Sequence, residues 1–371
     1  MKCKLSDICY FRKGKVEVEN LNTKNYISTE NMLPNKSGIT EATSLPNVSS
    51  TQEYKNGDVL VSNIRPYFKK IWQARYDGGC SNDVLVFVPK STTDRDFLYY
   101  LLADDDFFTY SMATSKGTKM PRGDKTSIMQ YEVPMVDFCT QKKIASVLKS
   151  LDEKIELNNA INENLEQQAQ AIFKSWFVHF EPFSNQMPSD WSVSTLGNIS
   201  IMGAGGDKPQ NVSPIKSNLY QYPIYSNGLS DEGLYGFTDK PKIFKESVTV
   251  SARGTIGFVC LRHIPYVPIV RLVTLIPKTE IISAKYLYLW LKQLHITGTG
   301  TTQQQLTIPD FRKTEILVPS QEIVTLFTDT VEPIFEKIWA NQSENEKLSS
   351  LRDTLLPKLM SGELDASVID L

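Results

Sequence analysis

The most regular pattern in the sequence lies between residues 141 and 182, where apolar residues and two asparagines recur at alternating steps of four and three. These steps are those of heptad a and d positions, and they predict one long helix whose seam packs on a partner helix. Thr140 is a candidate N-cap for this helix, and Pro182 is a candidate stop. At 1.5 Å per residue the helix would be a rod of roughly 55 Å. Its seam consists of Ile144, Leu148, Leu151, Ile155, Asn158, Asn162, Leu165, Ala169, Ile172 and Trp176.

A looser copy of the seam lies near the end of the chain. Pro333 falls within it and is expected to kink or restart the helix, because proline removes a donor and clashes with the preceding turn. One such seam could pack on its own domain, but two at matching points of the chain favour an antiparallel pair. Asparagines at seam positions would fix the register at some loss of stability. The second seam consists of Ile323, Phe327, Ile334, Ile338, Asn341, Leu348, Leu351, Leu355 and Leu359.

The segment before each seam appears twice in the chain. Six short matches recur in the same order at a nearly constant offset, among them FLYYLL (97–102) with YLYLWL (286–291) and DVLVFVPK (83–90) with RLVTLIPK (271–278). Each copy has short β-branched and aromatic runs broken by Gly, Pro, Asn and Ser, which indicates a mainly-β domain. We therefore predict an α+β protein with two repeated domains, 1–140 and 183–319. Two long helical segments, 141–182 and 320–371, would form an antiparallel coiled coil.

The composition of the chain limits the classes of function that we consider for it. The net charge of −2 hides an asymmetry, since residues 1–140 and 186–320 lean basic, by +1 and +4, while the two helical segments lean acidic. Five scattered cysteines without a C-x-x-C pair indicate neither a zinc site nor a disulfide framework, and favour a reduced, cytoplasmic setting. We expect no membrane segment and no signal peptide, because no apolar run approaches the required length.

Motifs for catalysis are missing from the sequence. It contains no G-x-x-x-x-G-K-[ST] phosphate loop and no G-x-S-x-G elbow. The Asn/Asp-Pro-Pro-aromatic motif of adenine methyltransferases and a PD…(D/E)-x-K nuclease pattern are also absent. We therefore expect a protein that is not itself an enzyme and that holds no metal.

Both globular domains contain basic residues interleaved with aromatic and amide side chains, the residue types that contact phosphates and base edges of DNA. They occur in IRPYFKKIWQARY (64–76), TSKGTKMPRGDK (114–125), YQYPIYSNG (220–228) and GTGTTQQQL (298–306). Ordinary surface charges remain an alternative for any one of them. The candidates are Arg65, Tyr67, Lys69, Lys70, Arg75, Lys116, Lys119 and Arg122 in the first domain, and Tyr225, Asn227, Lys240, Lys242, Arg253, Gln303 and Gln304 in the second.

Four stretches resemble the specificity (S) subunit of type I restriction–modification systems. They are NLEQQAQAIFKSWFVHFEP (164–182), DWSVSTLGNIS (190–200), YPIYSNG…GLYGFTD (222–239) and LRDTLLPKLMSGEL (351–364). The resemblance extends over both halves of the chain. It implies two target recognition domains separated by two conserved-region helices that pack as an antiparallel coiled coil.

This resemblance also implies the function. Each recognition domain would read one half of a bipartite DNA site, and the helices would set the gap. Two adenine-N6 methyltransferase subunits would dock through the helices, with restriction subunits joining outside. S-adenosylmethionine would be bound by the methyltransferase, so this chain would need no cofactor of its own. The candidates for helix pairing or methyltransferase docking, with internal packing as the alternative, are Phe173, Trp176, Phe177, Leu356, Leu359 and Met360.

Two other readings stay open at this point. The chain could be an unfamiliar nuclease or methyltransferase, which would turn over DNA alone with Mg²⁺ or S-adenosylmethionine. It could also be a scaffold that presents two domains on a rod, in which case the assembled complex would show no DNA preference.

Overall fold

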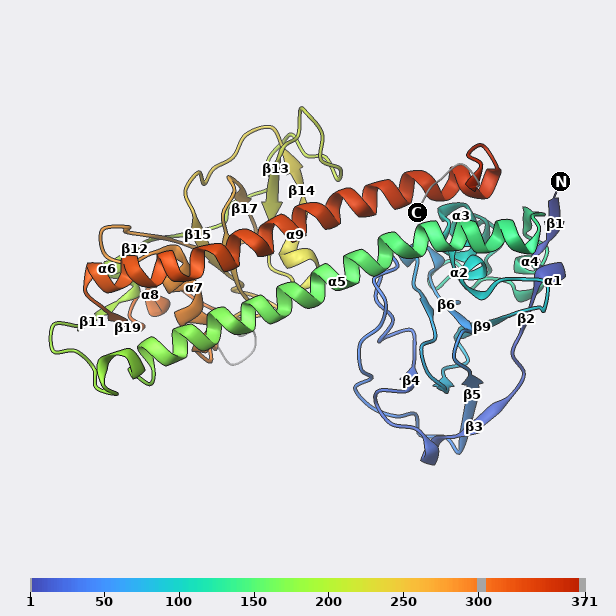
Figure 1. The fold of residues 1–371 in the computed structure, drawn as a ribbon, viewed down its shortest axis with the longest axis horizontal. Coiled ribbons are helices and arrows are strands. Elements are labelled where there is room, and N and C mark those ends of the chain that lie inside the picture. Colours follow the sequence, from blue (N-terminus) through green and yellow to red (C-terminus); the bar gives the residue numbers. More distant parts are fainter. Residues whose placement is uncertain (1, 299–304, 367–371) are drawn as a thin grey trace. The chain divides into compact units, whose positions relative to one another are not determined.

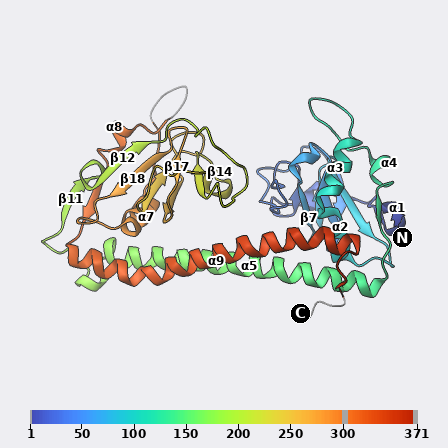
Figure 2. The same cartoon turned by 90° about the horizontal axis from the view of Figure 1, so that it is seen from above.

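The computed structural model describes residues 2–298 and 305–366. The chain divides into two compact units, of which unit 1 comprises Met1–Asn158 with Gln342–Leu371 and unit 2 comprises Asn159–Asn341. Each unit is one mainly-β domain with part of each long helix, α5 (Phe138–Phe177) and α9 (Gln321–Ser361). Figures 1 and 2 show both units.

The domain of unit 1 contains two four-stranded sheets. One has the strand order β2-β9-β6-β7 and is antiparallel, and the other has the order β3-β5-β8-β4, with β4 parallel to β8. The short pair β1-β10 joins the start of the domain to its end. The strands are β1 (Lys2–Lys4), β2 (Cys9–Phe11), β3 (Lys15–Glu17), β4 (Tyr26–Ile27), β5 (Ser50–Tyr54), β6 (Val59–Ser62), β7 (Ile71–Gln73), β8 (Gly78–Cys80), β9 (Val84–Pro89) and β10 (Glu132–Pro134). The helices are α1 (Leu5–Ile8), α2 (Arg95–Ala103), α3 (Asp105–Ala113) and α4 (Lys125–Ile128), with 3-10 turns η1 (Val18–Asn20) and η2 (Pro66–Phe68).

Unit 2 repeats this arrangement. Its main sheet has the order β12-β18-β15-β16, a second sheet has the order β14-β13-β17 with β13 parallel to β17, and the pair β11-β19 joins the ends of the domain. The strands are β11 (Ser192–Thr195), β12 (Ser200–Ala204), β13 (Tyr222–Tyr225), β14 (Leu234–Thr238), β15 (Ser247–Val250), β16 (Val259–Arg262), β17 (Val267–Pro268), β18 (Val273–Pro277) and β19 (Glu315–Val318). The helices are α6 (Leu196–Ile199), α7 (Ala284–Gln293) and α8 (Ile308–Phe311), with 3-10 turns η3 (Glu181–Phe183) and η4 (Ser230–Gly233).

The predicted repeat and α+β class are confirmed by this correspondence. Another of the six matches, LSDI (5–8) with LGNI (196–199), forms the short helices α1 and α6. FLYYLL and YLYLWL lie in α2 and α7, and each of these two helices comes directly after the strand that is second in its main sheet. An N-cap side chain begins each of the latter helices, Asp94 for α2 and Ser283 for α7. The same sequence pattern therefore produces the same main sheet and following helix twice, although the second sheet has four strands in unit 1 and three in unit 2.

The long helix α5 forms where the heptads predict it, although the predicted ends are wrong. Asp137, not Thr140, caps the helix, because its carboxylate accepts the backbone N–H groups of Cys139 and Thr140 at 2.9 and 3.0 Å. Thr140 instead donates its hydroxyl to Asp137. The helix ends at Phe177, before Pro182, and Phe180 adopts the left-handed conformation. All ten predicted seam positions are buried or half-buried.

Helix α9 continues through Pro333, so of the two predicted outcomes, a kink or a restart, the restart is wrong and the kink stays a prediction. Proline leaves one backbone carbonyl of the preceding turn without its helical partner, but this stretch of the helix is anchored by core contacts. Phe327, Val331 and Phe335 are buried around the proline. Apolar burial of this size outweighs one hydrogen bond. Leu351, a predicted seam residue, is 47% exposed and lies outside the seam.

In each unit the two helices lie side by side and run antiparallel (Figures 1 and 2). In unit 1 Asn158 of α5 donates to Glu344 and Asn345 of α9 at 2.8 and 2.9 Å, and Asp152 pairs with Arg352 further along α9. In unit 2 Asn341 donates to Asn162 at 2.8 Å. Rising numbers on α5 thus meet falling numbers on α9, as expected for the antiparallel pair.

The core of each unit joins its main sheet to both helices. In unit 1 Phe87 and Leu98 belong to the same buried cluster as Leu148 of α5 and Leu359 of α9. In unit 2 Val248 and Tyr286 share a cluster with Phe173 of α5 and Phe327 of α9. Each mainly-β domain is therefore packed on a helix pair by a continuous apolar core.

Candidate nucleic-acid interface

The two basic stretches predicted in the first domain come together in unit 1. The backbone N–H of Arg65 donates to the carbonyl of Pro121 at 2.8 Å, and isolated bridges join Arg122 to Ile64 and to Lys116. Residues 114–124 therefore form a hairpin-like loop docked against the segment that follows β6. Arg65 has a φ of 50°, a strained value for a residue other than glycine, and this contact holds it there.

The segment after β6 has exposed aromatic side chains, and its lysines are held by an ion pair and a hydrogen bond. Tyr67 is 49% exposed and packs its ring on Phe68. Lys69 pairs with Asp105 at 2.7 Å, and the ammonium of Lys70 donates to the carbonyl of Thr29 at 2.6 Å. Burial lowers the pKa of Lys70. Tyr67 is thus the candidate here whose side chain is most open to a ligand.

The loop 114–124 carries exposed cations that are held in place by carboxylates. Lys116 pairs with Asp124 at 2.6 Å, and Arg122 pairs with Asp83 at 3.1 Å. Hydrogen bonds from Lys116 and from Ser127 lower the pKa of Asp124 to about 2. Lys119 is exposed at the tip of the loop. This loop presents positive charge on a defined backbone, as a phosphate contact requires.

Arg75 is placed differently from the other candidates. Its guanidinium forms an ion pair with Glu156 of α5, and this pair raises the pKa of Arg75. The side chain therefore links the mainly-β domain to the helix, a contact that the sequence did not predict. Its assignment to DNA binding stays a prediction, and the observed contact favours a structural role.

In unit 2 two candidates hold the domain together. The ring of Tyr225 stacks under the guanidinium of Arg262, with 3.6 Å between the guanidinium carbon and the ring centroid. The side-chain amide of Asn227 donates to the carbonyl of Val270 at 2.7 Å and accepts the N–H of Ala252 at 2.8 Å. The ring of Tyr225 and the side-chain amide of Asn227 are thus both engaged within the unit, so they brace the surface beside them.

The remaining candidates of unit 2 that the structure describes lie on loops. Lys240 and Lys242 are exposed between β14 and β15, and exposed Arg253 donates to Gln305 at 2.9 Å. Gln303 and Gln304 lie outside the described residues. Phe244 was not among the predicted residues, although it is 70% exposed beside these lysines. The sequence K-I-F-K, in which an aromatic residue lies between two lysines, could have indicated it.

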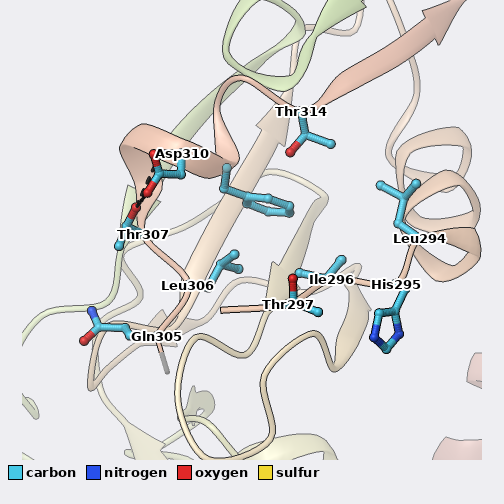
Figure 3. A pocket seen from close by; sticks show the side chains of 10 residues that line it. Leu294, His295, Ile296, Thr297, Gln305, Leu306, Thr307, Asp310 and Thr314 are labelled. Atoms are coloured by element: carbon cyan, nitrogen blue, oxygen red, sulfur yellow. Dashed lines mark hydrogen bonds between the residues drawn. The ribbon is translucent and has the colours of Figure 1, made fainter. Parts of the chain in front are cut away.

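Unit 2 also contains a cavity of about 280 Å³ between α7 and α8 (Figure 3). Threonine and aliphatic side chains dominate its wall, and the hydroxyl of Thr307 donates to Asp310 at 2.6 Å across the start of α8. The lining residues are Leu294, His295, Ile296, Thr297, Gln305, Leu306, Thr307, Asp310, Phe311 and Thr314. These side chains do not form a nucleophile–base–acid arrangement.

The six residues predicted for helix pairing or docking lie in the cores of the units. Phe173, Trp176 and Phe177 of α5 all contact the ring of Phe327 on α9, with centroids 4.9 to 5.9 Å apart. Leu356, Leu359 and Met360 are buried in the core of unit 1. Of the roles considered, helix pairing and internal packing fit these contacts.

Within residues 2–298 and 305–366, no three His, Cys, Asp or Glu side chains are grouped so that they could hold a metal ion. The helices of this part of the chain also include none with the length and apolar character of a bilayer span.

Comparison with known proteins identifies the family. A model of the type I restriction modification DNA specificity domain matches the chain twice, over residues 1–167 and 188–349. These matches cover the repeat seen in the sequence and in the sheets. The chain belongs to the family of type I restriction–modification specificity subunits.

Individual relatives agree with this assignment. The specificity subunit is 28% identical to the HindI specificity subunit of Haemophilus influenzae, over 91% of this chain and 94% of that one. It is 29% identical to the MjaIX specificity subunit of Methanocaldococcus jannaschii, over 75% and 71% of the two chains. A crystal structure of the S subunit from M. genitalium has the same fold, with a TM-score of 0.59 at 18% identity and coverage of 97% and 96%. Subunits of this family are the non-catalytic, DNA-recognition subunits of type I restriction–modification systems.

Proposed function

We propose that each unit of this specificity subunit reads one half of a bipartite DNA site, and that α5 and α9 set the number of base pairs between the halves. The observation that carries this proposal is the duplication of a whole recognition domain, with one strand order in both main sheets. Both domains are packed on the same two helices. A protein that read one uninterrupted site would not need the second copy.

Each domain offers the groups that DNA reading requires. Exposed Lys119 and Lys242 suit phosphates, and the guanidinium groups of Arg122 and Arg253 suit base edges, where arginine can form two hydrogen bonds. The loops of the two domains differ in sequence at matching places, with KMPR in the first and TQQQ in the second. Different side chains at these places would read different half-sites.

Joining two domains that each bind DNA weakly increases the affinity for DNA only when both domains can bind at once. The second half-site then binds intramolecularly, at an effective concentration that depends on the fit between the two sites and the connection. Helices of 40 and 41 residues connect the units, so the connection is regular structure and not a flexible linker. A connection of this kind would make the spacing of the half-sites part of the recognised sequence.

Catalysis would belong to partner subunits. We propose that two adenine-N6 methyltransferase subunits, which bind S-adenosylmethionine, dock through the helices and methylate the site chosen by this chain. Restriction subunits would join the complex for cleavage. This chain would then carry no cofactor of its own, in keeping with its lack of methyltransferase and nuclease motifs.

Single-molecule sequencing of N6-methyladenine in the source strain, with and without this gene, tests the proposal. The expected result is the loss of one split motif on deletion, with both half-sites and the gap read directly from the sequence. Methylation that does not change on deletion would contradict the proposal. A lost motif without a gap would contradict the two-reader arrangement.

A further inference from the structure

In both units a tyrosine hydroxyl ties the domain to a carboxylate of α5. Tyr100 of α2 donates to Asp152 at 2.7 Å, and Tyr288 of α7 donates to Glu166 at 2.7 Å. Both tyrosines are buried, and both helices follow the strand that is second in the main sheet. Both domains therefore bond a tyrosine hydroxyl to a carboxylate of α5. The two tyrosines occupy adjacent and not matching positions of the repeat, since the match of FLYYLL with YLYLWL pairs Tyr100 with Leu289.

Cations complete each connection and extend it to α9. In unit 1 Arg352 of α9 pairs with Asp152 at 2.6 Å, so one carboxylate joins the domain to both helices. In unit 2 Lys292 of α7 pairs with Glu166 at 2.9 Å. Lys285 of α7, which is 5% exposed, reaches Glu332 of α9 at 2.9 Å. The domain of unit 1 is thus bonded to α5, which is itself paired with α9, and the domain of unit 2 is bonded directly to both helices.

The carboxylate of Glu166 is held in its charged form. Burial by itself would raise its pKa, but hydrogen bonds from Tyr288 and Lys292 outweigh burial and lower it. A hydrogen bond to a charged group in a partly buried place is stronger than one between neutral groups. The connection therefore persists at neutral pH.

These bonds add a directional restraint to the packing of the apolar core. Hydrophobic burial is non-directional, so the orientation of a domain on its helices is set by close packing and by directional bonds. A hydroxyl–carboxylate bond weakens steeply as its distance and angle change. The tyrosine–carboxylate pairs thus increase the free-energy cost of small rotations of the domain on the helices.

We propose that Tyr100 with Asp152, and Tyr288 with Glu166, are positioning pairs that restrict the half-site spacing this subunit accepts. The inference rests on the proposed function and deepens it. Adding one base pair moves a half-site by about 3.4 Å along the DNA axis and rotates it by about 35°. A complex on such a site must turn a domain on its helices, which breaks these bonds, or leave one half-site unread.

The test uses the complete complex, with its methyltransferase co-expressed, on a DNA library. The library places the two half-sites at the natural spacing and at one and two base pairs more or fewer, and N6-methyladenine is read by sequencing. Tyr100→Phe and Tyr288→Phe each remove one oxygen atom and keep the ring. Tyr286→Phe is the matched control on α7, because its hydroxyl donates to Leu317 within the domain at 2.7 Å. Tyr110→Phe, whose hydroxyl donates to Ser127, is the control in unit 1.

For Tyr100→Phe and Tyr288→Phe, the ratio of methylation at the natural spacing to methylation one base pair away should fall by about tenfold. The half-site sequences should not change, and neither control should move the ratio. A spacing profile equal to that of the wild-type complex, or one broadened equally by the controls, would overturn the inference while leaving the proposed function intact. A wild-type complex that methylates no split site would overturn both.

Discussion

The aromatic contact between the helices in unit 2 makes a strong prediction about stability. Phe327 of α9 is completely buried, and its ring contacts Phe173, Trp176 and Phe177 of α5 and Tyr286 of α7. Truncating a buried phenylalanine to alanine removes its transfer free energy and leaves a cavity, which together cost about 3–5 kcal/mol. Because the partners are rigid rings from two helices, the cavity can collapse little. We therefore expect Phe327→Ala to lower the free energy of unfolding of unit 2 by about 4 kcal/mol.

Urea unfolding followed by tryptophan fluorescence measures this loss selectively. Unit 2 contains Trp176, Trp191, Trp290 and Trp339, whereas unit 1 contains only Trp72. At a slope of about 3 kcal/mol per molar urea, the midpoint should fall by about 1.3 M with the slope unchanged.

The neighbouring residue provides the control for this experiment. Leu326 is 53% exposed, and its replacement by alanine should change the free energy of unfolding by no more than about 0.5 kcal/mol. A loss below about 1.5 kcal/mol for Phe327→Ala, or equal losses for both variants, would refute the reasoning that this ring joins the helices.

Three further predictions concern polar groups. Asn158→Ala removes two hydrogen bonds to α9, one of them to the carboxylate of Glu344, and should lower the stability of unit 1 by about 2 kcal/mol in thermal or urea unfolding; a loss near zero would contradict a role in pairing. Lys119→Ala should weaken binding of the complex to all sequences alike and reduce the slope of log K against log salt by about 1, whereas a change confined to one base position would contradict a phosphate contact. Lys116→Ala should raise the pKa of Asp124 from about 2 toward its usual value, as measured by NMR titration. Since that pKa lies below the unfolded value of about 3.9, the contribution of Asp124 to stability is present above pH 4 and disappears as the pH falls toward 2 in the wild-type protein; an unshifted titration in the variant would show that Lys116 is not the cause.

Errors at the helix ends show where local sequence is ambiguous. Asp137 and Thr140 are both good capping residues, and only the point at which the chain leaves β10 selects Asp137. A proline inside a helix usually breaks or kinks it. Around Pro333, however, the aromatic and branched side chains are buried, and the residues that bury them lie far away in the sequence. Helix-propensity rules consider one segment at a time and do not include the free energy of burial against distant residues.

The structure shows which of the predicted interface residues are exposed, and their contact with DNA stays a prediction. The docking of the 114–124 loop on the segment after β6 brought two predicted basic stretches together, and Tyr67 and Lys119 are open as expected. Arg75 is not, because Glu156 lies 81 positions away in the sequence and beside it in the fold. The residues next to Arg75 in the sequence do not indicate whether its guanidinium is available to DNA or paired with a carboxylate of the same chain.

The sequence by itself determined the architecture, namely two copies of one domain and two heptad helices. Backbone geometry imposes fixed periods on helices and strands, so a repeated pattern of apolar positions is sufficient to specify repeated elements. Only the tertiary structure decided which side chains remain available. Whether Asn227 reads a base or braces a loop, and whether Tyr100 and Tyr288 fill a core or anchor a domain, depends on partners brought near by folding. Hydrogen bonds and ion pairs act over a few ångströms, and those distances are set by the packing of the elements and not by their order in the chain.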